Sequence, residues 1–184
     1  MALLIAATTQ SNWVLRYEPL AVFLYPLGLV IVAVAASGRT WCSFYLSGRK
    51  DSVLTIDGPY SLCRNPLYFF SGLGAIGVGL CTETLVFPAL MLAIFAIYYP
   101  GIIRREEVRL GEMFGEAYIQ YKLRTPAFFP SFECFTEPQR WNANPRLFRR
   151  HLTDDTMFVF VAALLGLIGK LRSAGIIPQM FQSW

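Results

Sequence analysis

Charged side chains are scarce in this 184-residue chain: Asp, Glu, Lys and Arg make up only 15% of it, whereas 55% of its residues are hydrophobic. A typical soluble domain carries about 25% charged residues. Such a composition excludes an intrinsically disordered chain, which combines low hydrophobicity with high charge. It also argues against a water-soluble globule, because so few charges cannot cover the surface of a small protein. The composition predicts a polytopic membrane protein.

Histidine and patterned cysteines are also lacking. The chain has one histidine and four cysteines without a CxxC motif, namely His151, Cys42, Cys63, Cys81 and Cys134. A structural zinc site needs four ligands at characteristic spacings, so we expect no metal, and we expect reduced thiols rather than disulfides. We expect the histidine to be a solvated surface residue. The first residues lack the basic segment of a signal peptide, so membrane insertion is expected to use uncleaved spans.

Three apolar stretches predict the membrane-spanning helices. Residues 19–38 carry no charge over 20 positions, which is the length that a spanning helix needs. The only charge within residues 66–103 is Glu83, near the middle, so this stretch predicts two helices joined by a tight turn. A shorter apolar run of 14 residues, 156–169, is followed by Lys170 and Arg172, so the possible last span at residues 156–178 either crosses the bilayer or lies partly at its interface. The predicted fold is a single all-α membrane domain with about four transmembrane helices, two of which form a central hairpin.

The basic residues predict the orientation. Of the 16 Lys and Arg residues, 13 lie in the two segments that flank the hairpin on one side. The positive-inside rule assigns that side to the cytoplasm, and we expect a bacterial inner membrane. Attraction to anionic lipids accounts for the net charge of +4, so no nucleic-acid partner is expected. Helical spacing continues the third helix through residues 104–121, and the prolines at 126 and 130 end it.

A glycine motif within the hairpin resembles a nucleotide-binding fingerprint. Gly72, Gly74 and Gly77 match GxGxxG. That fingerprint binds a pyrophosphate only when it follows a strand and opens a helix, whereas this one lies inside a predicted membrane helix. Small residues also recur at Ser71, Ala75 and Gly79, a spacing that allows close helix contact. We interpret the motif as a packing surface.

Polar residues gather at the ends of the predicted hairpin. The sequence GPYSLCRNPLY, residues 58–68, precedes it, and RREEV, residues 104–108, follows it. A hairpin brings these segments together, and the resulting pocket suits a zwitterion, with arginine and asparagine for a carboxylate and glutamates for an ammonium. A purely structural salt bridge between Arg64 and Glu106 fits the sequence equally well. The predicted spans contain no buried charge, which argues against an ion transporter.

These segments resemble the membrane methyltransferases that include isoprenylcysteine carboxyl methyltransferases and phospholipid N-methyltransferases. The resemblance rests on an Arg-x-Pro-x-Tyr motif at residues 64–68, a Glu-Glu pair at Glu106 and Glu107, and FGEAYIQY at residues 114–121. It covers about residues 56–132. Asn65 stands where the family has a histidine. Asparagine can position a ligand by hydrogen bonding, but it cannot carry a proton as histidine does.

The resemblance implies a cofactor, S-adenosyl-L-methionine, and a cytoplasmic segment at residues 104–132 that helps to bind cofactor and substrate. The implied cofactor contacts are Gly58, Tyr60, Arg64, Asn65, Pro66, Tyr68, Glu106 and Glu107. The implied substrate contacts are Tyr118, Tyr121 and Arg124, of which Arg124 has the catalytic role of orienting an acceptor carboxylate. The predicted activity is methylation of a carboxylate on a lipid-like or isoprenylated acceptor, with membrane lipids around it. Phospholipid amine N-methylation and a non-catalytic membrane scaffold are the alternatives.

Overall fold

The computed structural model describes residues 9–11, 18–47, 53–141, 143–176 and 181–183. Four long helices dominate this part of the chain: α3 (Glu18–Leu46), α5 (Pro66–Leu80), α6 (Val86–Phe114) and α8 (Pro145–Ser173). The shorter elements are α4 (Pro59–Leu62), α7 (Glu116–Arg124), the 3-10 turn η1 (Phe132–Cys134) and a parallel pair of three-residue strands, β1 (Thr9–Ser11) and β2 (Phe181–Ser183). Within α3, α6 and α8, residues 23–46, 86–114 and 145–171 are long and apolar enough to cross a membrane, and α5 is a shorter apolar helix. The expectation of an all-α polytopic membrane protein is confirmed, but three helices of the described chain reach spanning length where about four were predicted, because α5 has only 15 residues.

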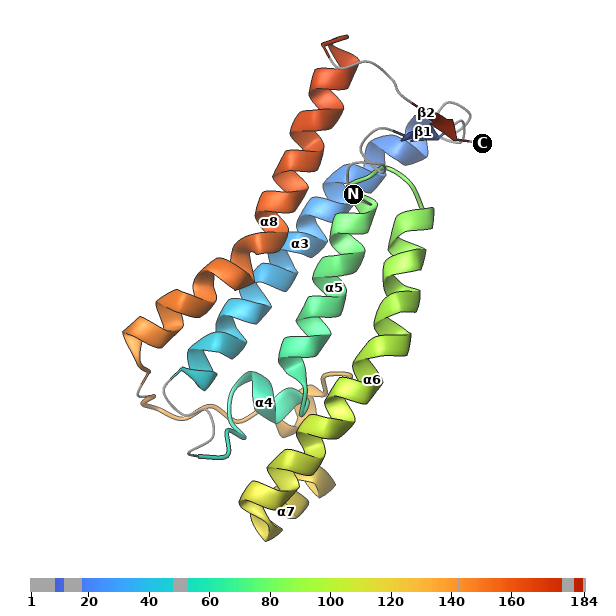
Figure 1. The fold of residues 1–184 in the computed structure, drawn as a ribbon. Helices are drawn as coiled ribbons and strands as arrows, with labels where there is room; N and C mark the ends of the chain where they lie inside the picture. Colours follow the sequence, from blue (N-terminus) through green and yellow to red (C-terminus); the bar gives the residue numbers. More distant parts are fainter. Residues whose placement is uncertain (1–8, 12–17, 48–52, 142, 177–180, 184) are drawn as a thin grey trace.

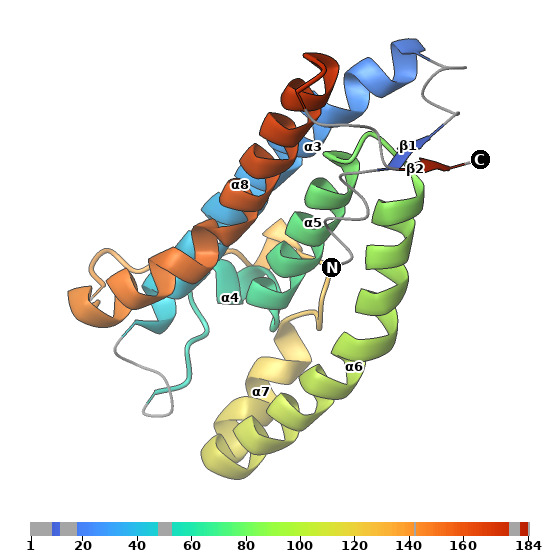
Figure 2. The same ribbon diagram turned by 45° about the horizontal axis from the view of Figure 1, so that its top comes forward.

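The long helices form a bundle in which α3 contacts both α5 and α8, and α5 also packs against α6 (Figure 1). Figure 2 shows the same order from another direction, with α5 between α3 and α6. Glycines make this close packing possible. A β-carbon on Gly28 would lie 2.7 Å from the carbonyl oxygen of Gly77, so α3 and α5 meet almost backbone to backbone.

The GxGxxG motif lies inside α5, and each of its glycines accommodates a different neighbour. A β-carbon would meet the Phe95 ring of α6 at Gly72, the Phe158 ring of α8 at Gly74, and the Val32 side chain of α3 at Gly77, all at about 3 Å. In the described chain α5 follows the helix α4 rather than a strand. The structure therefore supports the interpretation of this motif as a packing surface.

Several helix boundaries differ from the predicted ones, and the first long helix ends at Leu46 rather than near residue 38. The predicted helix over residues 104–121 is interrupted at Gly115, where a φ of +52° ends α6 and lets α7 turn back. Only glycine adopts this conformation at low cost, and helical periodicity on both sides conceals the break. The last helix begins at Pro145 rather than near residue 156 and is 29 residues long. It is therefore long enough to span the bilayer.

A buried ion pair joins the first and last long helices, so the expectation of spans without buried charge is wrong. Arg39 Nη2 of α3 lies 3.2 Å from Asp155 Oδ1 of α8, and the Asp155 side chain is only 1% exposed. Arg39 Nη1 also donates to Ser71 Oγ of α5. Both charged residues stand just beyond apolar runs in the sequence. They are buried because both helices continue past those runs and remain packed together.

Candidate functional site

The segment before α5 is held by hydrogen bonds to the chain that follows α7. We call residues 125–141 the strap. Backbone bonds join Arg64 N to Pro126 O at 2.8 Å, Ser131 N to Leu62 O at 2.9 Å, and Gly58 N to Thr136 O at 2.8 Å. Gly58 has a φ of +60° and packs so closely on the Tyr45 ring that a β-carbon would lie 2.4 Å from it. The strap and Gly58 therefore fix the backbone conformation of the polar segment at residues 58–68 that precedes and opens α5.

Arg64 is the hub of this arrangement. Its Nε and Nη2 donate to Glu107 Oε1 at 3.0 and 2.8 Å, and its Nη1 donates to the carbonyls of Lys122 at 3.0 Å and Thr125 at 2.8 Å. Lys122 Nζ approaches the other oxygen of Glu107 at 2.9 Å. The arginine thus ties the start of α5 to α6 and to the end of α7. A salt bridge does form here, but its acid is Glu107 rather than Glu106.

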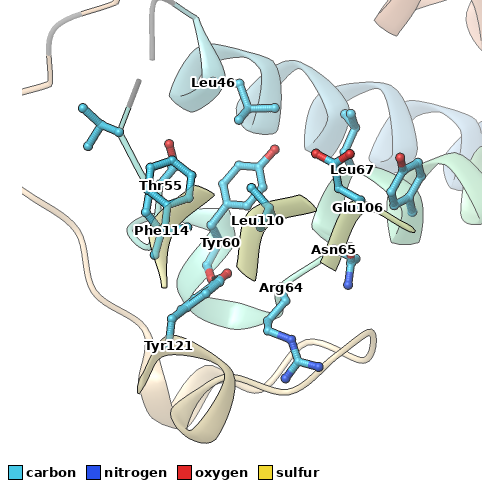
Figure 3. A pocket seen from close by; sticks show the side chains of 13 residues that line it. Leu46, Thr55, Tyr60, Arg64, Asn65, Leu67, Glu106, Leu110, Phe114 and Tyr121 are labelled. Carbon is cyan, nitrogen blue, oxygen red and sulfur yellow. Dashed lines mark hydrogen bonds between the residues drawn. The ribbon is translucent and has the colours of Figure 1, made fainter. Parts of the chain in front are cut away.

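Beside this hub is a cavity of about 200 Å³. Its lining is Leu46, Val53, Leu54, Thr55, Tyr60, Arg64, Asn65, Leu67, Tyr68, Glu106, Leu110, Phe114 and Tyr121. Figure 3 shows the Arg64 guanidinium directed away from the Glu106 carboxylate, toward the end of α7 and the strap. Apolar side chains from α3, the connector before α4, and α6 form one part of the wall. The polar groups come from α4, the start of α5, α6 and α7.

Glu106 is the acid that lines the cavity. Its side chain is 38% exposed, and the charged partner given by the structure is Arg109, one turn later and 3.9 Å away. Exposed ion pairs of this length contribute little, so the Glu106 carboxylate is only weakly neutralised. Arg64, by contrast, is neutralised by Glu107. The lining therefore holds one acid, Glu106, and one base, Arg64, and the guanidinium of that base is already bound to Glu107 and to backbone carbonyls.

Three tyrosines near the cavity stay protonated at neutral pH. The Tyr60 hydroxyl is buried and has no hydrogen-bond partner among the described residues, and burial raises its pKa well above the usual value. Tyr121 donates its hydroxyl to Tyr60 O at 2.7 Å, and burial raises its pKa also. Burial raises the pKa of Tyr118 to about 12. These side chains can donate hydrogen bonds but cannot serve as bases at neutral pH.

The structure brings together six of the predicted site residues and leaves five outside the cavity. Those that line it are Tyr60, Arg64, Asn65, Tyr68, Glu106 and Tyr121. Gly58 and Pro66 shape the backbone at α4 and α5, Glu107 pairs with Arg64, and Tyr118 is buried in α7. Arg124 is exposed in the last turn of α7. The roles proposed for these residues stay predictions.

The sequence reasoning missed the apolar half of the cavity. Leu110 and Phe114 follow Glu106 at intervals of four along α6, which is a recognisable helical face. Leu46 and Thr55 carry no such signal, because they come from the end of α3 and from the connector, and only the fold brings them to the cavity. Among the described residues, no group of three His, Cys, Asp or Glu side chains is arranged to hold a metal ion.

Comparison with known proteins identifies the family. Residues 17–117 match the family model for phospholipid methyltransferases. The chain is 38% identical over 154 residues to the cobalt-zinc-cadmium resistance protein CzcN of Cupriavidus metallidurans, covering 84% of this chain and 71% of that protein. It is 34% identical over 178 residues to the nickel-cobalt-cadmium resistance protein NccN of Alcaligenes xylosoxydans xylosoxydans, covering 97% and 82%. No solved structure gave a significant match.

A more distant relative is named as a methyltransferase. The protein-S-isoprenylcysteine O-methyltransferase of Schizosaccharomyces pombe is 28% identical over 99 residues, which is 53% of this chain and 42% of that protein. The chain belongs to the phospholipid methyltransferase family, within the membrane methyltransferase superfamily that its sequence resembles. It is thus an integral membrane protein that belongs to a methyltransferase family.

Proposed function

We propose that the protein transfers a methyl group from S-adenosyl-L-methionine to a carboxylate of a lipid-like or isoprenylated acceptor. The observation that carries this proposal is the cavity beside Arg64, in which Glu106 is a weakly neutralised carboxylate. The cofactor has two cationic groups, a sulfonium and an ammonium, and a carboxylate in a partly dehydrated cavity favours such cations. Family membership supports the same reaction class.

The residues present fit the charged end of this cofactor. A cavity of about 200 Å³ is smaller than the roughly 300–1,000 Å³ of pockets that enclose a whole drug-sized ligand. We therefore propose that it holds the methionine end. Asn65 Nδ2 already donates to Ala127 O at 2.9 Å, so its amide is fixed in place at the cavity wall. The unpartnered Tyr60 hydroxyl supplies a further donor.

This arrangement revises the role of Arg64 in the proposed site. Its guanidinium donates to Glu107 and to two backbone carbonyls, so few donors are left for a cofactor carboxylate. We propose that Arg64 and Glu107 position the cavity wall, while Glu106, Asn65 and the cavity-lining Tyr60 and Tyr68 contact the ligand. Of the predicted cofactor contacts, Gly58 and Pro66 then act through the backbone conformation.

The bound cofactor would supply an electrophilic methyl group, and the protein would have to position a nucleophile behind it and exclude water. A carboxylate acceptor is already anionic at neutral pH and needs no base, which agrees with a cavity whose buried tyrosines stay protonated. The name of the yeast relative, an O-methyltransferase, supports an oxygen acceptor. Arg124 follows the cavity-lining Tyr121 by three residues on α7, so we propose that it meets the acceptor carboxylate at this side.

Phospholipid amine N-methylation is the second candidate, because the matching family model is that of the phospholipid methyltransferases. An ammonium acceptor must lose a proton before it attacks, and Glu106 is the carboxylate in the cavity wall that could accept it. In both cases we propose that the cavity faces the cytoplasm of a bacterial cell. The cavity lies at the end of the hairpin that is flanked by 13 of the 16 basic residues, and the positive-inside rule assigns that end to the cytoplasm.

Cofactor binding tests the enzyme against the scaffold alternative. We expect detergent-purified protein to bind radiolabelled S-adenosyl-L-methionine, and Glu106→Gln to weaken binding by about tenfold, since a hydrogen bond to a charged group contributes about 1.5–3 kcal/mol. Glu112→Gln is the matched control, because Glu112 is an exposed acid of the same helix outside the cavity lining. Wild-type protein that is folded but binds no cofactor would favour the scaffold.

The acceptor is tested by the stability of the product. Purified protein is incubated with labelled cofactor and membrane lipids, and the lipid fraction is then treated with base. A carboxyl methyl ester releases volatile labelled methanol, whereas an N-methyl group remains on the lipid. Base-stable label in a phospholipid amine would contradict the carboxylate proposal and support the second candidate.

A further inference from the structure

Helix α5 is too short to cross a bilayer from one interface to the other. Its 15 residues span about 22 Å at 1.5 Å per residue, against roughly 30 Å for the hydrocarbon core. The cavity lies at the amino-terminal end of this helix, where Asn65 and Leu67 contribute to the lining. Because the turn after α5 leads directly into the spanning helix α6, the cavity end of α5 lies at or inside the opposite membrane boundary.

The strap reaches the same depth. The Phe128 ring lies 5.7 Å from the Phe69 ring of α5 and 6.0 Å from the Phe95 ring of α6, measured between centroids. Phe95 precedes Arg104, the first charged residue of α6, by nine positions, or about 13 Å along the helix. The strap therefore contacts the apolar portion of a spanning helix rather than its charged end.

Two neighbouring aromatic side chains of the strap are uncovered. Phe129 is 76% exposed and Phe132 is 78% exposed, and the Phe129 ring touches that of Phe128 at 5.4 Å. Phenylalanine side chains left in water at these exposures would forfeit most of the free energy that burial provides. Burial in lipid at the depth of Phe128 would recover that free energy.

We propose that residues 127–135 of the strap are immersed in the bilayer interface, with Phe129 and Phe132 inserted among the lipids. Asn65, which lines the cavity, donates to the carbonyl of Ala127 at the start of this segment. The lipid contact thus borders the cavity wall. This surface goes beyond the proposed methyl transfer and stands without it, since it depends only on the membrane-spanning helices and on the contacts of Phe128.

Spin labels test this immersion in vesicles of phosphatidylethanolamine and phosphatidylglycerol. Nitroxides are attached at Phe129→Cys and Phe132→Cys in a Cys134→Ser parent, whose remaining cysteines Cys42, Cys63 and Cys81 are buried. Ile97→Cys, 82% exposed within the apolar part of α6, is the lipid control. Glu112→Cys is the aqueous control, because this exposed residue lies about 12 Å beyond Arg104 along α6.

We expect the labels at 129 and 132 to collide more with oxygen than with a water-soluble nickel complex, as at position 97, and the reverse at position 112. Labels at 129 and 132 that behave like position 112 would overturn the proposal. Exclusion from both collision partners, together with spin–spin broadening that disappears on dilution with unlabelled protein, would assign the surface to a second copy of the chain and also overturn it.

A second measurement keeps the aromatic character of the segment. Phe129→Trp and Phe132→Trp are reconstituted in brominated lipids, and the added emission is compared with that of the parent. We expect this emission to be lost in brominated lipid and retained in unbrominated lipid. Equal emission in both would contradict immersion even if the cysteine variants fail to purify.

Discussion

Removing Asp155 should destabilise the protein strongly, because it leaves the largely buried Arg39 without its charged partner. Asp155 is 1% exposed and Arg39 is 16% exposed, so Asp155→Ala leaves the guanidinium with Ser71 as its remaining hydrogen-bond partner. Removing one partner of a buried pair costs about 3–5 kcal/mol. Arg39 keeps some contact with solvent, and its Nε is unpartnered even in the intact pair, so we expect the lower end, about 3 kcal/mol.

Replacing both charges should restore most of the loss. The double variant Arg39→Met/Asp155→Leu removes two charges together with two unsatisfied atoms, Arg39 Nε and Asp155 Oδ2. Apolar replacement of a buried ion pair is often neutral or stabilising, so we expect the double variant to lie within about 1 kcal/mol of wild type. With Arg39→Met and Asp155→Leu as the single variants of the cycle, the coupling energy between the two sites would then amount to several kcal/mol.

Thermal unfolding in detergent measures this cycle. A loss of about 3 kcal/mol corresponds to a fall in Tm of about 6–12 °C for a protein of this size. Asp154→Ala is the matched control, because Asp154 is the exposed neighbour of Asp155 on α8. If Asp155→Ala lowers the Tm no more than Asp154→Ala, or if the double variant is no more stable than the single ones, the ion pair does not join these helices as described.

Three further predictions test the packing and the motif. Arg64→Lys keeps the positive charge but loses the planar guanidinium that donates to Glu107 and to two backbone carbonyls. We therefore expect a lower Tm and weaker binding of labelled cofactor, whereas the control Arg104→Lys should change neither. Gly77→Val adds side-chain atoms where even a β-carbon would lie 2.9 Å from Val32, so we expect the free energy of unfolding to fall by about 1–3 kcal/mol, measured as a lower Tm. Gly101→Ala is the control and should leave the Tm unchanged, because no atom lies within 4 Å of its added β-carbon. Burial raises the pKa of Cys63 to about 11, so at pH 8 only about one thiol in a thousand is ionised, and mass spectrometry should find Cys63 alkylated by iodoacetamide only after unfolding.

Composition and hydropathy were sufficient to predict the class of protein. A chain with 55% hydrophobic and 15% charged residues has few stable alternatives to a helical membrane bundle, because lipid forces the backbone to satisfy its own hydrogen bonds. The motif at residues 64–68 and the pair Glu106–Glu107 were sufficient to predict the methyltransferase superfamily, which the comparisons confirm. Hairpin logic also predicted that these two segments meet, and Arg64 contacts Glu107 at 2.8 Å.

Tertiary structure decided which partners these residues have. Arg64 pairs with Glu107 because the orientation of α6 turns the Glu107 side chain toward the end of α7, whereas Glu106, one residue earlier, faces the cavity. The two acids are adjacent and chemically alike, so the sequence alone does not show which of them pairs with Arg64. Arg39 and Asp155 are 116 positions apart in the chain and meet only because α3 and α8 lie side by side, and no local pattern encodes that contact. The cavity likewise combines Leu46, Thr55 and Phe114 from three separate segments. Periodicity reports which face of a helix is apolar, but the neighbour that this face meets is set by the packing of the whole bundle.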